Sequence, residues 1–304
     1  MAVKNMEASV LARLKTQAKE EGIPFQMVLQ LFAQEEFLRK LALSEYADNL
    51  ILKGGMFIYT LTEFESRPTR DIDFLIRNLH GSLESMEQTM RKICGINTGN
   101  DFIALEVLKS SPISVEKKYP GVKTAFMARI GKIRIPFSID VGIDDIIVPG
   151  PTLRTIATRL PEFDSPKVLT YSLESTIAEK LDAILQRMAG TSRMKDFYDI
   201  YYLSGIFDFE GSILEEAVRR TLEYRKRELP ADAFSEIAAF KSNRFLITQW
   251  RAFEPAEETG LSFEGAVDRL CLFLEPIYQS IRMGTSFNKD WRCDTRQWKS
   301  CCQG

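Results

Sequence analysis

The sequence predicts an α+β protein in which a small mixed or antiparallel sheet is preceded and followed by helical regions. Three observations predict this class. Apolar residues recur at helical spacing before residue 49, form short or alternating runs between residues 49 and 148, and return to helical spacing after residue 170. With 304 residues, of which 45% are hydrophobic and 27% charged, the chain can build two folded domains.

The N-terminal region predicts two helices. Apolar residues at Val10, Leu11 and Leu14 indicate a helix over 7–20, and a longer apolar pattern indicates a largely buried helix over 25–43. Further along, we expect strands and helices in this order: strand 50–52, helix 56–62, strand 71–76, helix 82–93, and strands 102–108, 123–130 and 132–141. Gly131 between the last two strands predicts a tight hairpin.

Helical spacing then predicts helices over 172–188, 193–203, 212–227, 231–239 and 263–281. Cys293, Cys301 and Cys302 lie in the last dozen residues and match no zinc-site spacing, so we expect residues 290–304 to be frayed. The predicted organisation is N-terminal helices over 1–48, an α/β core over 49–164, a helical C-terminal domain over 165–285, and a disordered tail over 286–304.

Composition excludes several classes of site. His80 is the single histidine and lies in a turn-like segment, so a histidine-based triad or a His-rich metal site is not expected. No apolar run is long enough to cross a membrane, and the N-terminus lacks the apolar region of a signal peptide. We therefore expect a cytoplasmic protein with no membrane partner, reduced cysteines, and chemistry carried by carboxylates, basic side chains and backbone amides.

Asp71–Ile72–Asp73 is the first chemical motif. Residues two apart on a strand point to the same face, so the two carboxylates would lie side by side and repel each other unless a cation binds. Mg²⁺ prefers such oxygen ligands, with substrate phosphates in its remaining positions. Asp140 ends an alternating strand and can join the same polar face if the two strands share a sheet. It can then bind metal or accept the proton of an attacking hydroxyl.

Gly54–Gly55 lies between a predicted strand and a predicted helix. Glycines there let backbone amides approach an anion that the helix N-terminus favours, although a plain turn that needs small residues is the alternative. Arg67 and Arg70 precede the two acids and are suited to hold phosphates.

In these segments the sequence resembles the AbiEii/AbiGii-type nucleotidyltransferases, a group with the polymerase-β-like fold. The resemblance covers roughly residues 50–203. It is carried by Leu52–Gly55, Arg67–Phe74, Ile139–Gly142, Ala178–Leu181 and Ser192–Asp199. Asp144–Asp145 departs from the pattern, because relatives often have Gly-Asp there.

The resemblance implies a catalytic set of Asp71, Asp73, Asp140, Lys180 and Asp196, with the first three as ligands of Mg²⁺ or Mn²⁺. The expected nucleotide-binding set is Lys53, Gly54, Gly55, Arg67, Thr69, Arg70, Arg193, Lys195 and Asp199. From spacing alone, Lys180, Lys195 and Asp199 are more typical of surface ion pairs, and the resemblance is what favours an active role for Lys180 and Asp196.

The implied function is transfer of a nucleotidyl group from an NTP to RNA, with tRNA one candidate, or to protein. The implied role is in a toxin–antitoxin or phage-defence system with a cognate antitoxin protein. A nucleotide-binding module without turnover, or a protein-modifying phospho- or adenylyltransferase, remains an alternative. A basic cluster offers an RNA contact, although interspersed glutamates favour a solvated, ion-paired surface instead: Arg219, Arg220, Arg225, Lys226 and Arg227.

Overall fold

The computed structural model describes residues 6–113, 121–143 and 145–300. The chain divides into two compact units, Met1–Asp144 with Pro151–Tyr171, and Asp145–Gly150 with Ser172–Gly304. Asp144, the first residue of the Asp144–Asp145 departure, lies outside the described residues. No helix in the described part of the chain is long and apolar enough to span a membrane.

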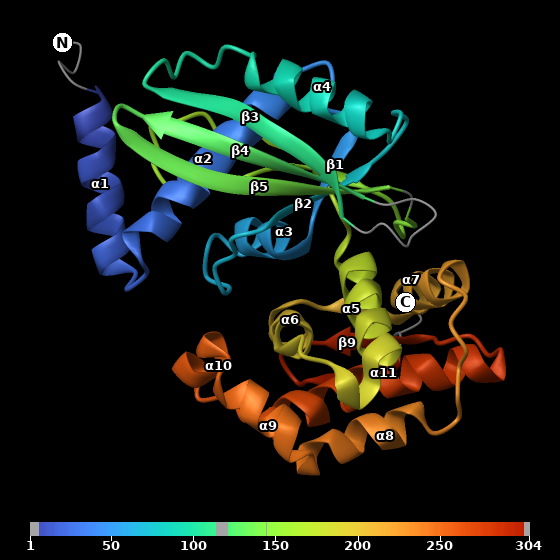
Figure 1. Cartoon of the computed structure of the whole chain (residues 1–304). Helices are drawn as coiled ribbons and strands as arrows, with labels where there is room; N and C mark the ends of the chain where they lie inside the picture. The colour runs from blue at the N-terminus through green and yellow to red at the C-terminus, as the bar shows by residue number, and fades with distance from the viewer. Residues whose placement is uncertain (1–5, 114–120, 144, 301–304) are drawn as a thin grey trace. The chain divides into compact units, whose positions relative to one another are not determined.

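The first unit contains most of the strands (Figure 1). Its helices are α1 (Met6–Glu20), α2 (Phe25–Ala42), α3 (Gly54–Leu61) and α4 (Leu83–Cys94). Its strands are β1 (Leu50–Lys53), β2 (Ile72–Ile76), β3 (Ile103–Pro112), β4 (Val122–Ile130), β5 (Ile133–Ile143), β6 (Thr152–Thr155) and β7 (Lys167–Thr170). The predicted elements of this region are therefore present, and β6 and β7 are additional.

Seven strands of the described residues form one mixed sheet in the order β3-β4-β5-β2-β1-β7-β6. β2 pairs parallel with β5 and β1 parallel with β7, whereas the other neighbours pair antiparallel. Ile130 pairs with Ile133 at the predicted Gly131 hairpin. This mixed sheet confirms the predicted fold class.

One face of the sheet is covered by α2 and α4 (Figure 1). Phe37 of α2 contacts Phe74 of β2 and Phe126 of β4, with ring centroids 6.0 and 5.6 Å apart. α3 contacts β1 and β2. Because side chains alternate along a strand, Asp73, which precedes Phe74, points away from the α2 face.

α2 also buries charged residues. Glu35 is 1% exposed and accepts hydrogen bonds from the backbone N–H of Arg159, which is 3.2 Å from its Oε2, and from the Arg39 guanidinium at 3.3 Å. Burial, partly offset by Arg39 and Arg159, raises the pKa of Glu35 from 4.5 to about 7. The carboxyl therefore attaches the segment before β7 to α2.

This pKa predicts a pH-dependent stability. A raised carboxyl pKa stabilises the fold below about pH 4.5, and this contribution is lost as the pH rises through about 7. Between pH 5 and 7 the unfolding free energy of the parent should fall relative to Glu35→Gln, by up to about 1.4 kcal/mol per pH unit. Urea unfolding across this range measures the difference, with exposed Glu84→Gln as the control. Equal slopes for the parent and Glu35→Gln would contradict the assignment.

The second unit is mainly helical. Its helices are α5 (Leu173–Arg187), α6 (Met194–Ile206), α7 (Gly211–Tyr224), α8 (Ala233–Ala239), α9 (Arg244–Arg251), α10 (Glu254–Thr259) and α11 (Phe263–Met283), with short 3-10 turns at Met188–Gly190 and Phe240–Ser242. Ser172 caps α5, because its side chain accepts a hydrogen bond from the Ser175 amide. The predicted helices are present, and α9 and α10 are additional.

The expectation of a disordered tail is wrong for residues 289–300. β9 (Lys289–Arg292) and β10 (Gln297–Ser300) form a hairpin that pairs with β8 (Phe209–Glu210) in a separate three-stranded sheet of the described residues. Trp291 is fully buried, and its indole N–H donates to the Ser204 carbonyl at 2.7 Å. Both Trp291 and the half-buried Trp298 pack on Phe273 of α11, which provides the packing that the polar local sequence does not indicate.

Candidate active site

Four charged residues lie in register across the centre of the sheet. Asp73 of β2 is paired with Asp140 of β5 on one side and with Lys53 of β1 on the other. Asp140 is in turn paired with Lys123 of β4. Residues in register on neighbouring strands point to the same face, so this row places two carboxylates between two lysines.

The Asp140 carboxylate is ion-paired with the neighbouring strand. Lys123 Nζ lies 3.1 Å from Asp140 Oδ1 and 3.4 Å from Oδ2, and only the Oδ2 contact has hydrogen-bond geometry. Oδ1 is shielded from solvent and has no hydrogen-bond partner among the described residues. The Lys123 ammonium is therefore the cation nearest to Oδ1, and a metal ion bound there would share this oxygen with it. At the other end of the row, Lys53 Nζ lies 5.0 Å from the Tyr171 ring centroid.

Gly54 and Gly55 are needed by the side chains around them. Gly54 has φ +69°, and a Cβ there would lie 2.4 Å from Asp73 Oδ2. A Cβ on Gly55 would lie 2.8 Å from Thr69 Oγ1. The glycines therefore let the start of α3 approach Asp73 and Thr69 closely. Small residues are therefore required at this turn by the packing around it, and the predicted approach of its backbone amides to an anion stays a prediction.

Gly54→Ala is expected to displace the Asp73 carboxylate and lower transfer activity by about 10²-fold, the order that a displacement of about 1 Å costs. Gly99→Ala is the matched control, because Gly99 also has a positive φ, +78°, but an added Cβ there would meet nothing within 4 Å. Both variants bear backbone strain, and only the first meets a carboxylate. Initial rates and thermal unfolding of both variants test this. Equal activity in the two would contradict it.

The segment before Asp71 is fixed by α2. Gln30 and Gln34 donate side-chain hydrogen bonds to the Arg70 carbonyl, at 2.6 and 2.9 Å. Buried Thr69 donates to the Asp71 carbonyl at 3.2 Å, whereas the Arg70 side chain is exposed and Arg67 is half-buried. Both arginines are thus on an anchored segment that leads into the acidic strand.

Asp71 differs from the other two acids. β2 begins at Ile72, and the Asp71 side chain is exposed. Among the described residues, no group of three or more His, Cys, Asp or Glu side chains is arranged to hold a metal ion. The register therefore brings together Asp73 and Asp140, and Asp71 is not part of a three-carboxylate group in this structure.

A second charged cluster lies in the other unit, between α5 and α6. Lys180 of α5 contacts Asp199 at 2.5 Å and Asp196 at 3.5 Å, and Arg193 Nε is 2.6 Å from Asp196 Oδ2. Asp196 and Asp199 are 1% and 2% exposed. The surface ion pairs that spacing alone favoured are therefore wrong for Lys180 and Asp199, because the packing of the two helices buries them. Lys195 of α6 is half-buried.

The family of the chain follows from comparison with known proteins. Residues 36–269 match the family described as "Nucleotidyl transferase AbiEii toxin, Type IV TA system". The chain belongs to the AbiEii nucleotidyltransferase toxin family. The match confirms the family resemblance of the motifs and shows that the protein is a nucleotidyltransferase.

The fold is shared with a solved toxin structure. MenT4, a nucleotidyltransferase toxin from Mycobacterium tuberculosis, is 16% identical, with a TM-score of 0.52 over 92% of this chain and 99% of that chain. A structure described as a putative nucleotidyltransferase from H. pylori is 13% identical, with a TM-score of 0.49 over 87% of this chain and 100% of its own. No curated protein gave a significant sequence match.

The basic cluster on and after α7 of this AbiEii-family protein is largely paired. Arg219 contacts Glu215, Glu216 and Glu223, and Arg220 contacts Glu216. Arg225 and Arg227 lie beyond the end of α7 and both contact Asp182, and Arg225 also contacts Asp145 and Glu179. The structure thus supports the alternative in which these basic residues are ion-paired on the surface. Asp145, from the Asp144–Asp145 segment where the sequence departs from the family pattern, is one of their carboxylate partners.

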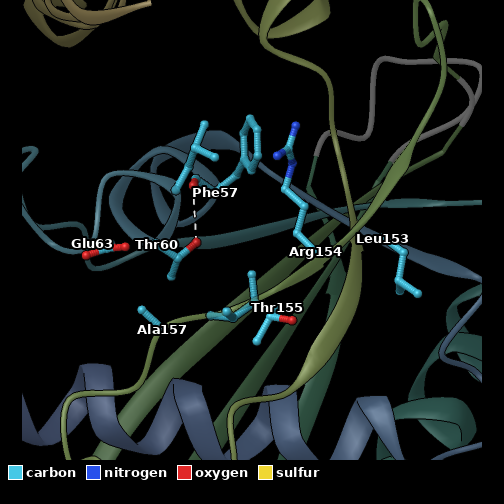
Figure 2. A pocket seen from close by; sticks show the side chains of 9 residues that line it. Phe57, Thr60, Glu63, Leu153, Arg154, Thr155 and Ala157 are labelled. Atoms are coloured by element: carbon cyan, nitrogen blue, oxygen red, sulfur yellow. Dashed lines mark hydrogen bonds between the residues drawn. The ribbon is translucent and has the colours of Figure 1, made fainter.

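A cavity of about 360 Å³ lies between α3 and the edge strand β6. Figure 2 shows the Arg154 side chain extending beside the Phe57 ring in this cavity. Arg154 Nε is shielded and has no hydrogen-bond partner among the described residues. None of the predicted site residues of the AbiEii-family enzyme lines this cavity.

Lys123 belongs to the charged row of this nucleotidyltransferase, although the sequence motifs do not single it out. A signal for it is nevertheless present in the sequence. A hairpin that pairs Ile130 with Ile133 brings Lys123 opposite Asp140 when both strands are followed away from Gly131. The predicted hairpin is therefore enough to find Lys123: counting pairs from Ile130–Ile133 back along both strands leads to the Lys123–Asp140 pair.

Proposed function

We propose that this AbiEii-family enzyme transfers a nucleotidyl group from an NTP to an RNA hydroxyl, with a divalent cation, as the toxin of a toxin–antitoxin pair. The observation that carries the proposal is the in-register pair Asp73–Asp140, which lies beside the Gly54–Gly55 turn and between Lys53 and Lys123. Two carboxylates, a close backbone approach and two ammonium groups are the components that triphosphate chemistry needs.

The donor set suits Mg²⁺ or Mn²⁺. These ions are commonly held by one or two carboxylates, and substrate phosphates and water complete the coordination. Asp73 and Asp140 would be the protein ligands, with the Lys123 ammonium beside them on Asp140. When bound, the cation supplies positive charge that stabilises the triphosphate during displacement. Asp71, on the segment that Gln30 and Gln34 hold, is proposed as a third acid that would add negative charge near the cation.

The reaction is an in-line displacement. The acceptor oxygen forms a bond to the α-phosphorus as the bond to pyrophosphate breaks, and the proton of the acceptor hydroxyl passes to a carboxylate, for which Asp140 is proposed. Lys53, Arg67 and Arg70 are proposed to hold the phosphates, with Thr69 and Gly55 shaping the turn. Lys180 and Asp196 are proposed as catalytic residues by family resemblance, with Arg193, Lys195 and Asp199 in the nucleotide-binding set.

A transfer assay tests the function. The full chain is incubated with total RNA, a divalent cation and each α-³²P-labelled NTP in turn, and we expect label in RNA together with released pyrophosphate. Chelation of the cation should stop the labelling. Label from γ-³²P-NTP but not from α-³²P-NTP would instead identify a phosphotransferase. Calorimetric NTP binding without turnover on RNA or protein would identify a binding module.

The toxin role and the antitoxin partner are tested in cells. Induced expression is expected to arrest growth, and co-expression of the protein encoded by the adjacent gene is expected to relieve the arrest. A cytoplasmic location is proposed to accompany this role, because cellular NTP and RNA would be the substrates. Growth unaffected by expression of an active transferase would reject the toxin role and leave the enzymatic proposal in place.

A further inference from the structure

β4 and β5 present one apolar face and one open face. On the α2 side, alternate residues of both strands are buried, including Phe126, Ala128 and Ile139. The residues between them are mostly exposed or half-buried, as in an antiparallel sheet with one solvated face. Asp73 and Asp140 point to this second face, so the open face extends directly from the acid pair.

The register divides the open face of β4 and β5 into successive pairs. Starting at the acid pair, they are Lys123–Asp140, Ala125–Ser138, Met127–Pro136 and Arg129–Arg134. The middle pairs carry short or uncharged side chains, and the last pair is two arginines. At about 3.3 Å per residue, the face runs about 20 Å from Lys123 to Arg129.

The pair of opposed arginines, Arg129 and Arg134, does not contribute to the stability of the sheet. Like charges directly opposite each other on neighbouring strands destabilise a sheet. Arg129 has a partner in Glu106 of β3, at 3.1 Å, and both side chains are about half exposed. Arg134 is exposed, and within the described part of the chain no carboxylate lies within ion-pair distance of it. Lys109 of β3 is paired in register with Ala125, is also exposed and adds a further positive charge to this face.

We infer that this open face of β3, β4 and β5 is the RNA-binding surface of the enzyme, with Lys109, Arg129 and Arg134 holding acceptor phosphates. The inference rests on the proposed transfer to RNA and adds where the acceptor lies. Every nucleotide of an RNA strand carries one phosphate charge, so a face of about 20 Å lies along several phosphates. The net charge of the chain is −2, so an RNA must be held by local positive charge.

The shape of the face favours phosphate contacts over base recognition. The residues of β4 and β5 on this face include no aromatic side chain on which a base can stack, and between Lys123 and Arg129 lie half-buried Ala125 and buried Met127. Contacts to phosphates position a nucleic acid without reading its sequence. The face is therefore expected to bind RNA of many sequences and to direct its reactive end toward Asp140.

The test compares two charge-matched double variants of the full chain. Arg129→Gln/Arg134→Gln removes the arginines of the open face, whereas Arg219→Gln/Arg220→Gln removes two arginines of α7 that have carboxylate partners. Affinity for fluorescein-labelled tRNA is measured by anisotropy between about 50 and 200 mM salt without NTP, and NTP affinity by calorimetry. We expect the first variant to bind RNA about tenfold or more weakly, with a salt slope lower by about 1 to 2. The second variant should bind as the parent does.

Each outcome separates this inference from the proposed function. Parental RNA affinity and labelling in Arg129→Gln/Arg134→Gln would overturn the inference while RNA transfer stands. Weaker NTP binding in that variant would also overturn the inference, because the open face would then bind the nucleotide substrate. If the parent labels a protein and not RNA, and this labelling needs Arg129 and Arg134, the surface binds an acidic protein and the inference fails together with the RNA acceptor.

Discussion

Asp73→Asn is expected to reduce nucleotidyl transfer by about 10³-fold while the fold is retained. The substitution keeps the shape of the side chain beside Gly54 and removes the negative charge from the centre of the row. Charge stabilisation by a bound cation contributes several kcal/mol, and each 1.4 kcal/mol is a factor of about ten in rate. Asp140→Asn should have an effect of the same order, since it is the in-register partner.

The measurement is the initial rate of label transfer from the preferred α-³²P-NTP, with circular dichroism as the check on folding. Asp101→Asn is the matched control, because Asp101 is an exposed acid of the same unit and lies outside the site. Growth arrest in cells should follow the transfer rate. Transfer within a factor of about three of the parent in Asp73→Asn would show that the acid pair does not carry the chemistry.

Lys180→Met is expected to have the largest effect on stability, about 3–5 kcal/mol of unfolding free energy. Lys180 is about nine-tenths buried and contacts two carboxylates that are 1% and 2% exposed. Removing one partner of a buried ion pair leaves the other charge desolvated without compensation. Because Asp199 lies only 2.5 Å from the ammonium, it should bear most of this cost.

Urea unfolding of the full chain measures the effect, and Lys241→Met is the control. Lys241 pairs with Asp268 at 2.7 Å, but both side chains are substantially exposed, so its loss should cost at most about 1 kcal/mol. Adding Asp199→Asn to Lys180→Met should restore part of the stability, because the double variant buries one carboxylate charge fewer beside the lost ammonium. A double variant that is less stable by the sum of the two single losses would argue against direct coupling.

The local sequence pattern is sufficient to predict most helices and strands and the tight turn at Gly54. The alternation of apolar residues over 123–141 and Gly131 predicts two strands and a hairpin, which the structure has. The close approach at Gly54 follows from a strand that runs into a Gly-Gly turn before a helix. β6 and β7 are not predicted, because strands of four residues carry too little periodicity to stand out.

The tail and the α5–α6 cluster could not be predicted locally. Residues 289–300 are mostly polar, but Trp291 reaches the Ser204 carbonyl, far away in sequence, and that contact orders the hairpin. Lys180 and Asp199 have the spacing of surface residues, and only the packing of α5 on α6 removes them from water. In both cases the partner that makes burial favourable is distant along the chain.

By itself, the sequence determined the fold class and the family and proposed the acids of the site, because periodicity and short motifs are local properties. Only the tertiary structure decided the pairing. Parallel alignment of β2 with β5 places Asp73 opposite Asp140, antiparallel alignment of β4 adds Lys123, and the same register leaves Arg129 facing Arg134 on an open face. The physical reason is that register is set by which faces of distant strands bury together, and a shift of one residue in any of these strands would turn the charges of that strand into the core.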